Sequence, residues 1–316
     1  MDIAKLKKVV GFYGRFLVSF SALGYRARSL TWGPLRADFT GQTWVVTGAT
    51  GGIGRAIVAG AASHGATVIA LARDRGKLED LVRSTPGPGR VTPLAVDLAL
   101  VADTRRAARD IAMRGKPADV LVNNVGVLLD DLSVTEEGFE TSYATNLLNH
   151  WVLTEALLQS GMLASKAVVI EMSSGGMYNA PLTLDYMGVK DAGKYNGVYA
   201  YAVHKRGQAE LVKYWHDLHA AQGRRFYVMH PGWADTAGVQ TAMPNFRRRL
   251  KVVLRDSAQG ADTALWLAAT RPADPGPEAF WFDRAPRAAH AYPHTARSKY
   301  GPPDLAAFLA REAGSV

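Results

Sequence analysis

Tyr201 and Lys205 form the pair of residues in this sequence that is best suited to acid–base chemistry. Residues four positions apart on a helix share one face, so the Lys205 ammonium would lie beside the Tyr201 phenol. A free phenol has a pKa of about 10, and a nearby cation favours the phenolate and lowers that pKa toward neutrality. Tyr201 could then exchange a proton with a substrate oxygen. The neighbouring Tyr195 and Tyr199 have no lysine four positions later.

A glycine-rich loop, TGATGGIG at residues 47–54, is the second chemical signal. The loop follows a predicted strand and opens a predicted helix, whose unpaired N–H groups and dipole favour a bound phosphate. Glycine lets the backbone approach such a group closely. A glycine turn without a ligand is the alternative, but strand, loop and helix together favour a dinucleotide site. Its candidate contacts are Gly48, Thr50, Gly51, Gly52, Ile53 and Gly54.

The loop and the Tyr–Lys pair belong to a regular alternation of predicted strands and helices. The predicted strands cover residues 44–47, 67–72, 91–96, 120–123, 167–172, 225–230 and 279–282. Several are continuous runs of Val, Ile and Leu, as in strands buried on both faces. The predicted helices cover 55–63, 102–112, 136–158, 198–221 and 257–269. This alternation predicts an α/β fold with a doubly wound parallel sheet (a Rossmann fold) of about seven strands.

Composition excludes several kinds of chemistry. The 316 residues include no cysteine, which rules out disulfides, thiolate nucleophiles and zinc–thiolate sites. The histidines form no set of three converging ligands, so we expect no metal. The chain has 37 Lys and Arg against 28 Asp and Glu, a surplus that attracts anions. Part of the surplus is clustered near residue 250, at Arg247, Arg248, Arg249, Lys251 and Arg255. A solvated basic surface is the simpler interpretation, and no nucleic-acid-binding motif accompanies the charge.

Residues 1–33 precede the α/β pattern as a basic, amphipathic helical extension. Its longest uncharged run, 16–25, is too short to span a bilayer. Together with the basic stretch 247–251, the extension could hold the protein at a membrane surface; alternatively, its apolar stripe packs onto the domain or onto a second subunit. A catalytic domain over 34–285 and a tail over 286–316 follow. The apolar stripe consists of Leu6, Val9, Val10, Tyr13, Phe16, Leu17, Phe20 and Leu23.

The ordered motifs between residues 40 and 285 resemble the short-chain dehydrogenase/reductase family. The glycine loop has that family's TGxxxGxG spacing, Tyr201 and Lys205 match its YxxxK, and residues 123–126, NNVG, stand for its NNAG. The resemblance implies a nicotinamide cofactor and hydride transfer at a carbonyl or alcohol group. It adds cofactor contacts at Asp97, Leu98, Asn124, Val125, Gly126, Tyr201, Lys205, Pro231, Gly232 and Thr236.

The same resemblance assigns roles to two further residues and completes an expected catalytic set with Tyr201 and Lys205. Ser174 would orient the substrate oxygen, because the family's serine is usually the second of such a pair, and Ser173 would be its structural neighbour. Asn146 would hold a water that links Lys205 to solvent. The alternative for Asn146 is a hydrogen bond to a local backbone group, which asparagine commonly makes.

One spacing departs from the commonest pattern of the family. The interval from Ser174 to Tyr201 is about twice as long as in many members, and the insert at 178–196 resembles the retinol-dehydrogenase-like branch. More narrowly, segments such as SSGGM and HPGWADT resemble the subgroup called dehydrogenase/reductase member 12. Neither resemblance identifies a substrate. His204, inside the YxxxK motif, is expected on the helix surface.

The end of the second strand predicts NADP, with NAD less favoured. NAD sites usually have an acid there for the ribose 2′-OH, whereas NADP sites supply arginine. Here the position holds Ala72, Arg73 follows, and Asp74 comes too late. We therefore expect an oxidoreductase that transfers a hydride between NADP(H) and a carbonyl or alcohol of a small or lipid-like molecule.

Two other functions compete with this prediction. One is a catalytically silent dinucleotide-binding sensor or scaffold, which would have no need of the Tyr–Lys pair. The other is a peripheral membrane protein whose main task is lipid contact. We expect a cytoplasmic protein, free or at a membrane surface, with a small-molecule substrate and no nucleic-acid partner; a homo-oligomer stays open.

Overall fold

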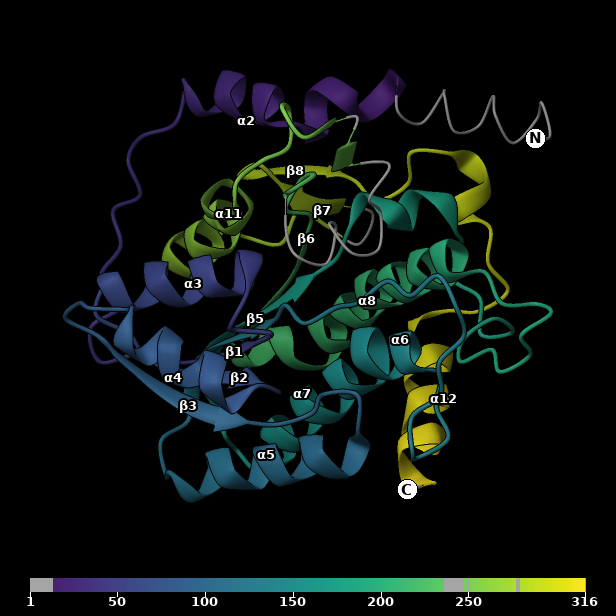
Figure 1. Cartoon of the computed structure of the whole chain (residues 1–316), viewed down its shortest axis with the longest axis horizontal. Helices are drawn as coiled ribbons and strands as arrows, with labels where there is room; N and C mark the ends of the chain where they lie inside the picture. The colour runs from purple at the N-terminus through teal and green to yellow at the C-terminus, as the bar shows by residue number, and fades with distance from the viewer. Residues whose placement is uncertain (1–13, 236–246, 249, 277–278, 316) are drawn as a thin grey trace.

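The computed structural model describes residues 14–235, 247–248, 250–276 and 279–315. In this part of the chain an eight-stranded sheet, in the order β3-β2-β1-β4-β5-β6-β7-β8, lies between two layers of helices (Figure 1). All neighbouring strands are parallel except β7 and β8. The predicted doubly wound α/β fold is therefore confirmed. The strands are β1 Thr43–Thr47, β2 Thr67–Ala72, β3 Arg90–Ala95, β4 Ala118–Asn123, β5 Leu163–Met172, β6 Arg225–Met229, β7 Ala279–Phe282 and β8 Ala285–Ala288.

The eighth strand is the main difference from the predicted sheet. β8 returns antiparallel to β7 after a tight turn at Asp283 and Arg284, which both have positive φ. Most of its residues are exposed, and it contains Pro286, which strands tolerate at sheet edges. The sequence pattern of a buried strand is absent for that reason.

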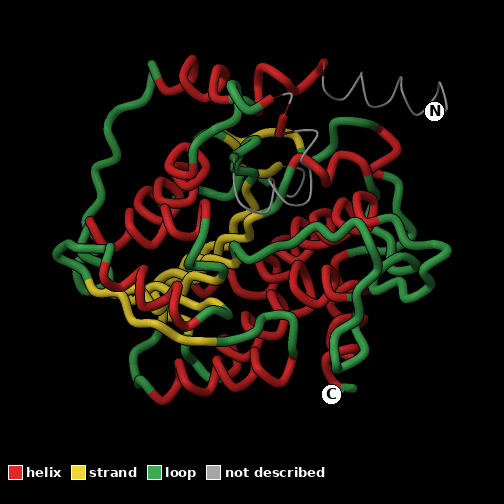
Figure 2. Tube along the Cα trace, in the orientation of Figure 1, coloured by secondary structure: helices red, strands yellow, loops and turns green. Residues whose placement is uncertain are grey.

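Helices cover both faces of the sheet, each over a cluster of buried apolar side chains (Figure 2). Successive side chains of a strand point to opposite faces, so Val45 of β1 belongs to one cluster while Trp44 and Val46 belong to the other. Apolar residues of α3 Gly52–Ser63, α4 Arg75–Arg83 and α11 Ser257–Thr270 complete the second cluster. The first cluster includes α5 Val101–Met113, α7 Asn149–Gln159, α8 Gly197–His219 and α12 Pro302–Gly314.

The helix predicted at 136–158 begins later than expected. Val134 and Glu140 form an isolated bridge, and the Glu140 carboxylate accepts from the amides of Ser142 and Tyr143. These bonds start α6 Thr141–Tyr143, which continues as a π-helical turn, Ala144–Leu148, and then as α7. The buried acid therefore acts as a helix cap.

The C-terminal segment 286–316, treated above as a tail, contains a helix within its described residues. α12 buries Leu305 and Leu309, and Phe308 packs near the ring of Tyr143. Figure 1 shows this helix running beside α8 and α6. α12 therefore covers part of the face that carries the Tyr–Lys helix.

The N-terminal arm, defined here as residues 14–32, packs onto the domain. It is helical over 14–20 and in α2 Ala22–Ser29, and it buries Phe16 and Phe20. Phe20 contacts the rings of His230 and Phe282, whereas Leu23 is 55% exposed. The described part of the apolar stripe thus packs partly onto the chain itself. Leu6, Val9, Val10 and Tyr13 lie outside the described residues.

Candidate active site

The side chains of Tyr201, Lys205 and Ser174 meet at the carboxyl end of β5. The Lys205 ammonium donates to the carbonyl of Met172, the last residue of that strand, at 2.8 Å, and lies 5.5 Å from the centre of the Tyr201 ring. Tyr201 hydrogen-bonds Ser174 through its hydroxyl. Asn196 caps the start of α8 by accepting from the Tyr199 amide. The helix and the strand end together give these groups their common position.

The two neighbouring serines have different surroundings. Ser173 is buried and donates to the Lys205 carbonyl at 2.8 Å, which ties β5 to α8. Ser174 lies two residues after the strand, accepts from the Gly176 amide at 3.2 Å and contacts the Tyr201 hydroxyl. Only Ser174 of the two therefore has its hydroxyl beside the phenol.

Asn146 lies in the π-helical turn, a local distortion that is frequent at functional sites. Its side-chain amide is fully buried and makes two 2.7 Å bonds, accepting from the Val127 amide and donating to the Val127 carbonyl. A Cβ added at Gly126 would lie 3.3 Å from both Asn146 Oδ1 and Lys205 Nζ. Asn146 thus contacts the loop after β4 beside the lysine, and the water-holding role stays a prediction.

Burial dominates the electrostatics of the pair. Burial raises the pKa of Tyr201, and the Ser174 hydrogen bond opposes that rise. Burial also lowers the pKa of Lys205 to about 8, against the opposing effect of Glu171. The expectation that Lys205 lowers the pKa of Tyr201 needs correction for this structure, because desolvation of the phenol outweighs other effects and the ammonium bonds the Met172 carbonyl.

The expectation for His204 was wrong. This residue is fully buried, lies 3.8 Å from the Glu140 carboxylate and packs near the Tyr143 ring. Burial and the Lys205 charge lower its pKa to about 3, so the imidazole stays neutral. The α6 and α12 helices cover this face of α8, which a sequence motif of five residues does not reveal.

The glycine loop has the geometry that a phosphate site requires. Gly48 and Gly52 have φ of 63° and 48°, and a side chain at Gly54 would collide with the Gly48 carbonyl. The N-cap of α3, Gly51, offers no side-chain hydrogen bond to the first turn of the helix. The N–H groups of that turn therefore point from the helix end without a side-chain cap and fit an anionic ligand.

A second loop is tied to the first by threonine and asparagine side chains. Thr47 Oγ1 accepts from the amides of Asn124 and Val125 at 2.9 and 3.0 Å. Asn124 in turn donates through Nδ2 to the Thr47 carbonyl at 2.9 Å. The structure thus brings the predicted contacts of residues 48–54 and 124–126 to one edge of the sheet. Thr50 and Ile53, in the first loop, are partly exposed.

Arg73 and Asp97, two predicted cofactor contacts, are neighbours just after the ends of β2 and β3. The Arg73 side chain is 80% exposed and 3.8 Å from the Asp97 carboxylate. Asp74 caps α4 by accepting from the Lys77 amide at 2.9 Å. The capping role explains why an acid follows Arg73 in the sequence. Leu98 is buried, and its carbonyl accepts from an asparagine of α7.

The last predicted cofactor segment is only partly described. Gly232 has a φ of 80°, and a side chain there would collide with the Arg255 guanidinium. The Pro231 carbonyl accepts from Arg255 Nη1 at 3.3 Å. Both residues therefore belong to the same end of the sheet as the glycine loop, whereas Thr236 lies outside the described residues.

A family model described as short chain dehydrogenase matches residues 42–245 of this chain. The chain belongs to the short-chain dehydrogenase family. The family and the dehydrogenases and reductases among its relatives make it an oxidoreductase.

Two relatives match nearly the whole length of this short-chain dehydrogenase, and a third matches a smaller part. Dehydrogenase/reductase SDR family member 12 of Bos taurus is 34% identical over 292 residues, 90% of each chain. The Homo sapiens protein of that name is 33% identical over 300 residues, 93% of each chain, which confirms the narrower resemblance. Human retinol dehydrogenase 13 is 30% identical over 70% of each chain.

Solved structures support the fold. A protein of Mycobacterium Paratuberculosis superposes with a TM-score of 0.68 and 24% identity, covering 88% of this chain and 95% of its own. A Beutenbergia cavernae protein described as an NAD(P) dependent gluconate 5-dehydrogenase superposes with a TM-score of 0.62 and 24% identity, covering 73% and 91%. That structure contains bound NADP.

Sequence reasoning missed one residue that organises the site. Arg255 was counted in a basic surface cluster, but its side chain is 1% exposed and pairs with Asp283 at 2.6 Å. It donates to the Phe20 carbonyl at 3.0 Å as well as to Pro231, so it joins the N-terminal arm to the cofactor segment. The sequence feature that could have indicated this pair is Asp283, an acid directly after the apolar strand β7, where an unpaired charge would be unusual.

Proposed function

We propose that this short-chain dehydrogenase transfers a hydride between NADP(H) and a carbonyl or alcohol group of a small or lipid-like molecule. The contact of Tyr201 with Ser174, beside Lys205 and next to the two cofactor loops, is the observation that carries the proposal. A phenol that is hydrogen-bonded to a serine and partly exposed is placed to exchange a proton with a bound oxygen.

Each of the four candidate catalytic residues has a distinct task. Tyr201 gives a proton to the substrate oxygen in reduction and takes one from it in oxidation. Ser174 holds that oxygen by a hydrogen bond, and Asn146 holds the loop at Val127. Lys205 returns protons to the phenol and, as in the family, binds a ribose hydroxyl. The cofactor, when bound, supplies or accepts the hydride.

The preference for NADP rests on Arg73. The guanidinium projects into solvent at the end of β2, where a 2′-phosphate of the cofactor would be placed, and the nearby Asp74 is engaged as a helix cap. Arginine binds phosphate through paired hydrogen bonds, whereas an NAD site usually has a carboxylate here. The glycine loop and the uncapped start of α3 fit the pyrophosphate.

An apolar substrate is supported by the name of one relative. Human retinol dehydrogenase 13 matches 70% of this chain, and retinol is an apolar alcohol. A direct test is to screen aldehydes and ketones of increasing apolar length with purified protein and NADPH, following the cofactor's absorbance. We expect cofactor consumption with at least one carbonyl compound. NADPH binding without turnover of any compound would favour the silent sensor or scaffold.

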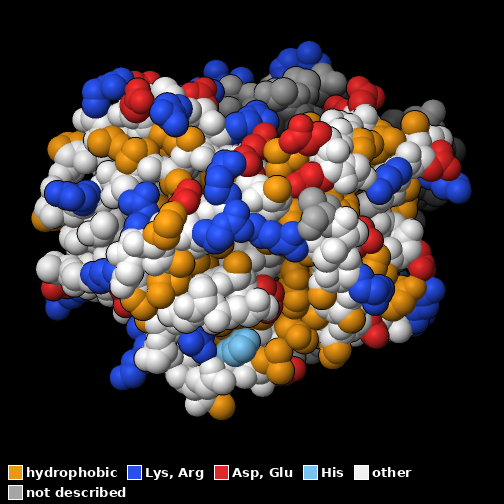
Figure 3. All heavy atoms as spheres, turned by 90° about the horizontal axis from the view of Figure 1, so that it is seen from below, with side chains coloured by type: hydrophobic (Ala, Val, Ile, Leu, Met, Phe, Trp, Pro, Cys, Tyr) orange, Lys and Arg blue, Asp and Glu red, His pale blue; other side chains and the backbone are white. Residues whose placement is uncertain are grey.

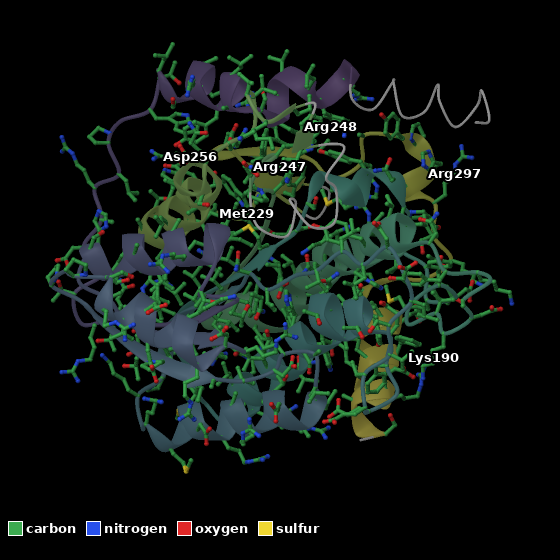
Figure 4. All side chains as sticks on the ribbon, viewed as in Figure 1. Lys190, Met229, Arg247, Arg248, Asp256 and Arg297 are labelled. Carbon is green, nitrogen blue, oxygen red and sulfur yellow. The ribbon has the colours of Figure 1, made fainter. Side chains whose placement is uncertain are left out.

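Peripheral membrane contact is a second function that one surface favours. The arm and the stretch 247–255 are joined by a 2.8 Å bond from the Ala22 amide to the Val253 carbonyl, and neither contains an acid. Figure 4 shows Arg247 and Arg248 at the α2 end of the molecule. The outward side chains include Val18, Leu23, Leu30 and Val252, which are 66%, 55%, 87% and 97% exposed.

Apolar side chains beside exposed cations suit an anionic lipid surface. Figure 3, which views the molecule from below, shows Lys and Arg side chains beside Asp and Glu. Among the described residues no helix is long and apolar enough to cross a membrane. The apolar and basic side chains of this surface support the proposal of a peripheral contact with a membrane, from the cytoplasmic side.

Vesicle sedimentation tests this contact. We expect the full chain to bind vesicles with phosphatidylserine more than pure phosphatidylcholine, and Leu23→Ser with Leu30→Ser to weaken the binding. Val82→Ser, on the exposed side of α4, is the matched control. Equal binding by all variants would contradict the assignment of this surface.

A further inference from the structure

A network of buried polar side chains lies directly behind the site and has no part in the chemistry described so far. It joins β4, β5, α7 and α8, and every member is at most 1% exposed. Buried polar groups without partners are costly, so such a network constrains the side chains that it contains. Its members are Asn123, His150, Thr154, Glu171 and Gln208.

Two bonds connect the network to the candidate site. His150 Nε2 is 3.0 Å from the carbonyl of Val125, in the second cofactor loop. Gln208 Nε2 donates to the carbonyl of Asn146 at 2.7 Å and lies 3.1 Å from His150 Nδ1. The imidazole and the amide thus fix two backbone carbonyls that belong to candidate site residues.

The geometry of His150 requires a shared proton. The Val125 carbonyl can only accept, so Nε2 carries a hydrogen. On the other side of the ring, Nδ1 is 2.7 Å from Glu171 Oε2, and one proton must lie between these atoms. Either Glu171 is a neutral acid beside a neutral imidazole, or a carboxylate faces an imidazolium. In both cases one proton is shared between Nδ1 and Oε2, and the pair has no net charge.

The opposite side of Glu171 is anchored as well. Asn123 Nδ2 donates to Glu171 Oε1 at 2.6 Å and to Thr154 Oγ1 at 3.0 Å. The acid is therefore held between β4 and α7, and it can hold the ring of His150 in one orientation.

We propose that His150, oriented by Glu171, is a positioning residue of the active site. It fixes the Val125 carbonyl and, with Gln208, the Asn146 carbonyl. In this way it sets the distance between the loop after β4 and α8, the helix that carries Tyr201 and Lys205. The inference rests on the proposed function, because these two carbonyls matter only if the cofactor and the substrate bind where the loops meet. A misplacement of about 1 Å costs roughly a hundredfold in rate.

Two substitutions separate positioning from stability. His150→Phe keeps a ring of similar size but loses the bonds to Val125 and Glu171. Thr154→Val keeps the shape and removes a bond of the same network that touches neither Val125 nor Asn146. We expect His150→Phe to lower kcat/KM about tenfold to a hundredfold and to weaken NADPH binding. Thr154→Val is expected to change both values by less than about twofold, although it lowers Tm.

Hydrogen–deuterium exchange of the ligand-free protein gives a readout that needs neither activity nor cofactor. His150→Phe is expected to speed exchange in peptides over 123–127 and 144–148, and Thr154→Val to leave them as in the parent. Unchanged exchange and unchanged NADPH affinity in folded His150→Phe would overturn the proposal. If the parent itself binds no NADPH, the proposed function fails while the exchange comparison still decides the inference.

A conservative pair covers the case in which His150→Phe does not fold. The amide of Glu171→Gln can donate to His150 Nδ1 and accept from Asn123, so it replaces the protonated acid, whereas Glu171→Leu can do neither. We expect Glu171→Gln to bind NADPH more tightly than Glu171→Leu and to keep slow exchange over 123–127. A Glu171→Gln protein that exchanges faster than the parent in that peptide would contradict the proposal.

Discussion

The candidate site has two halves, which we propose bind the nucleotide and the substrate, and the halves are built in different ways. In the nucleotide half, Thr47, Gly54 and Asn124 make their contacts within β1, the start of α3 and the loop after β4. In the substrate half, residues far apart in the sequence meet: the Phe20 carbonyl accepts from Arg255, and Phe20 packs against Gly175, the neighbour of Ser174. Short motifs therefore describe the first half, whereas the second depends on long-range packing.

The substrate half also has the more unusual electrostatics. Arg255 is buried with Asp283 and lies within 5.3 Å of the Tyr25 ring centre. The Gly175 amide donates to Nδ1 of His230, whose pKa burial holds well below its usual range. A neutral histidine and a buried ion pair thus support the loops on either side of Ser174 and Gly232. We infer that the N-terminal arm is an integral part of this half.

The largest expected effect comes from the residue that the two halves share. Lys205→Ala removes the ammonium beside Tyr201 and the donor to a ribose hydroxyl. We expect kcat to fall by roughly 10³ or more and NADPH affinity to fall as well, measured by turnover and by a fluorescence titration. Loss of turnover with unchanged NADPH affinity would restrict Lys205 to the substrate half.

The next prediction acts on the substrate half alone. Asp283→Asn keeps the backbone, because asparagine tolerates positive φ, but leaves the Arg255 charge buried without its acid. Breaking such a pair costs about 3–5 kcal/mol. Urea unfolding should show this loss, while Asp262→Asn, whose partner Arg284 is less buried, should lose less. Similar losses of unfolding free energy in both variants would argue against a special role for the Arg255–Asp283 pair in holding the arm.

A smaller effect is expected in the nucleotide half. Arg73→Ala should weaken NADPH binding by about tenfold, the lower end for a charged hydrogen bond at an exposed site. NADH binding should stay within about twofold, because its ribose carries no 2′-phosphate. Arg75→Ala, two residues later in α4, is a suitable control. Equal losses of affinity for NADPH and NADH would mean that Arg73 does not discriminate between the two cofactors.

The smallest effect concerns pH. Burial lowers the pKa of Lys205 to about 8, so between about pH 8 and the ordinary lysine value of about 10.4 the unfolded chain binds more protons at this residue than the folded chain. The contribution of Lys205 to the free energy of unfolding therefore increases as pH rises through that window. Lys205→Met should lack this gain, which a comparison of urea unfolding at pH 7.5 and 9.5 would detect. Parallel pH dependences would mean that Lys205 is not desolvated.

The same contrast explains what the sequence could predict. All seven predicted strands exist, because buried strands show themselves as short apolar runs between turns. The eighth strand is an exposed edge strand that contains Pro286, and the start of the helix near Thr141 depends on a hydrogen bond that the Ser142 amide donates to Glu140. Neither feature has a periodic sequence signal. Local patterns identify elements, but they do not show what packs on them.

The site shows the same limit. The spacing of Tyr201 and Lys205 predicts their shared helix face, and the structure places them beside Ser174. The spacing does not predict the burial of His204 or the raised pKa of Tyr201, since both depend on distant segments such as α12 and β5. Arg255 was counted with exposed cations because its partner Asp283 follows much later in the chain.

The central claim is that Tyr201 exchanges the proton with the substrate oxygen. The direct measurement is single-turnover oxidation of bound NADPH by a carbonyl substrate, in the parent and in Tyr201→Phe, with the NADPH affinity of each determined separately. The account predicts a rate lower by about 10²–10⁴ in Tyr201→Phe and an NADPH affinity within about twofold of the parent. A Tyr201→Phe protein that turns over at the parent's rate would contradict it.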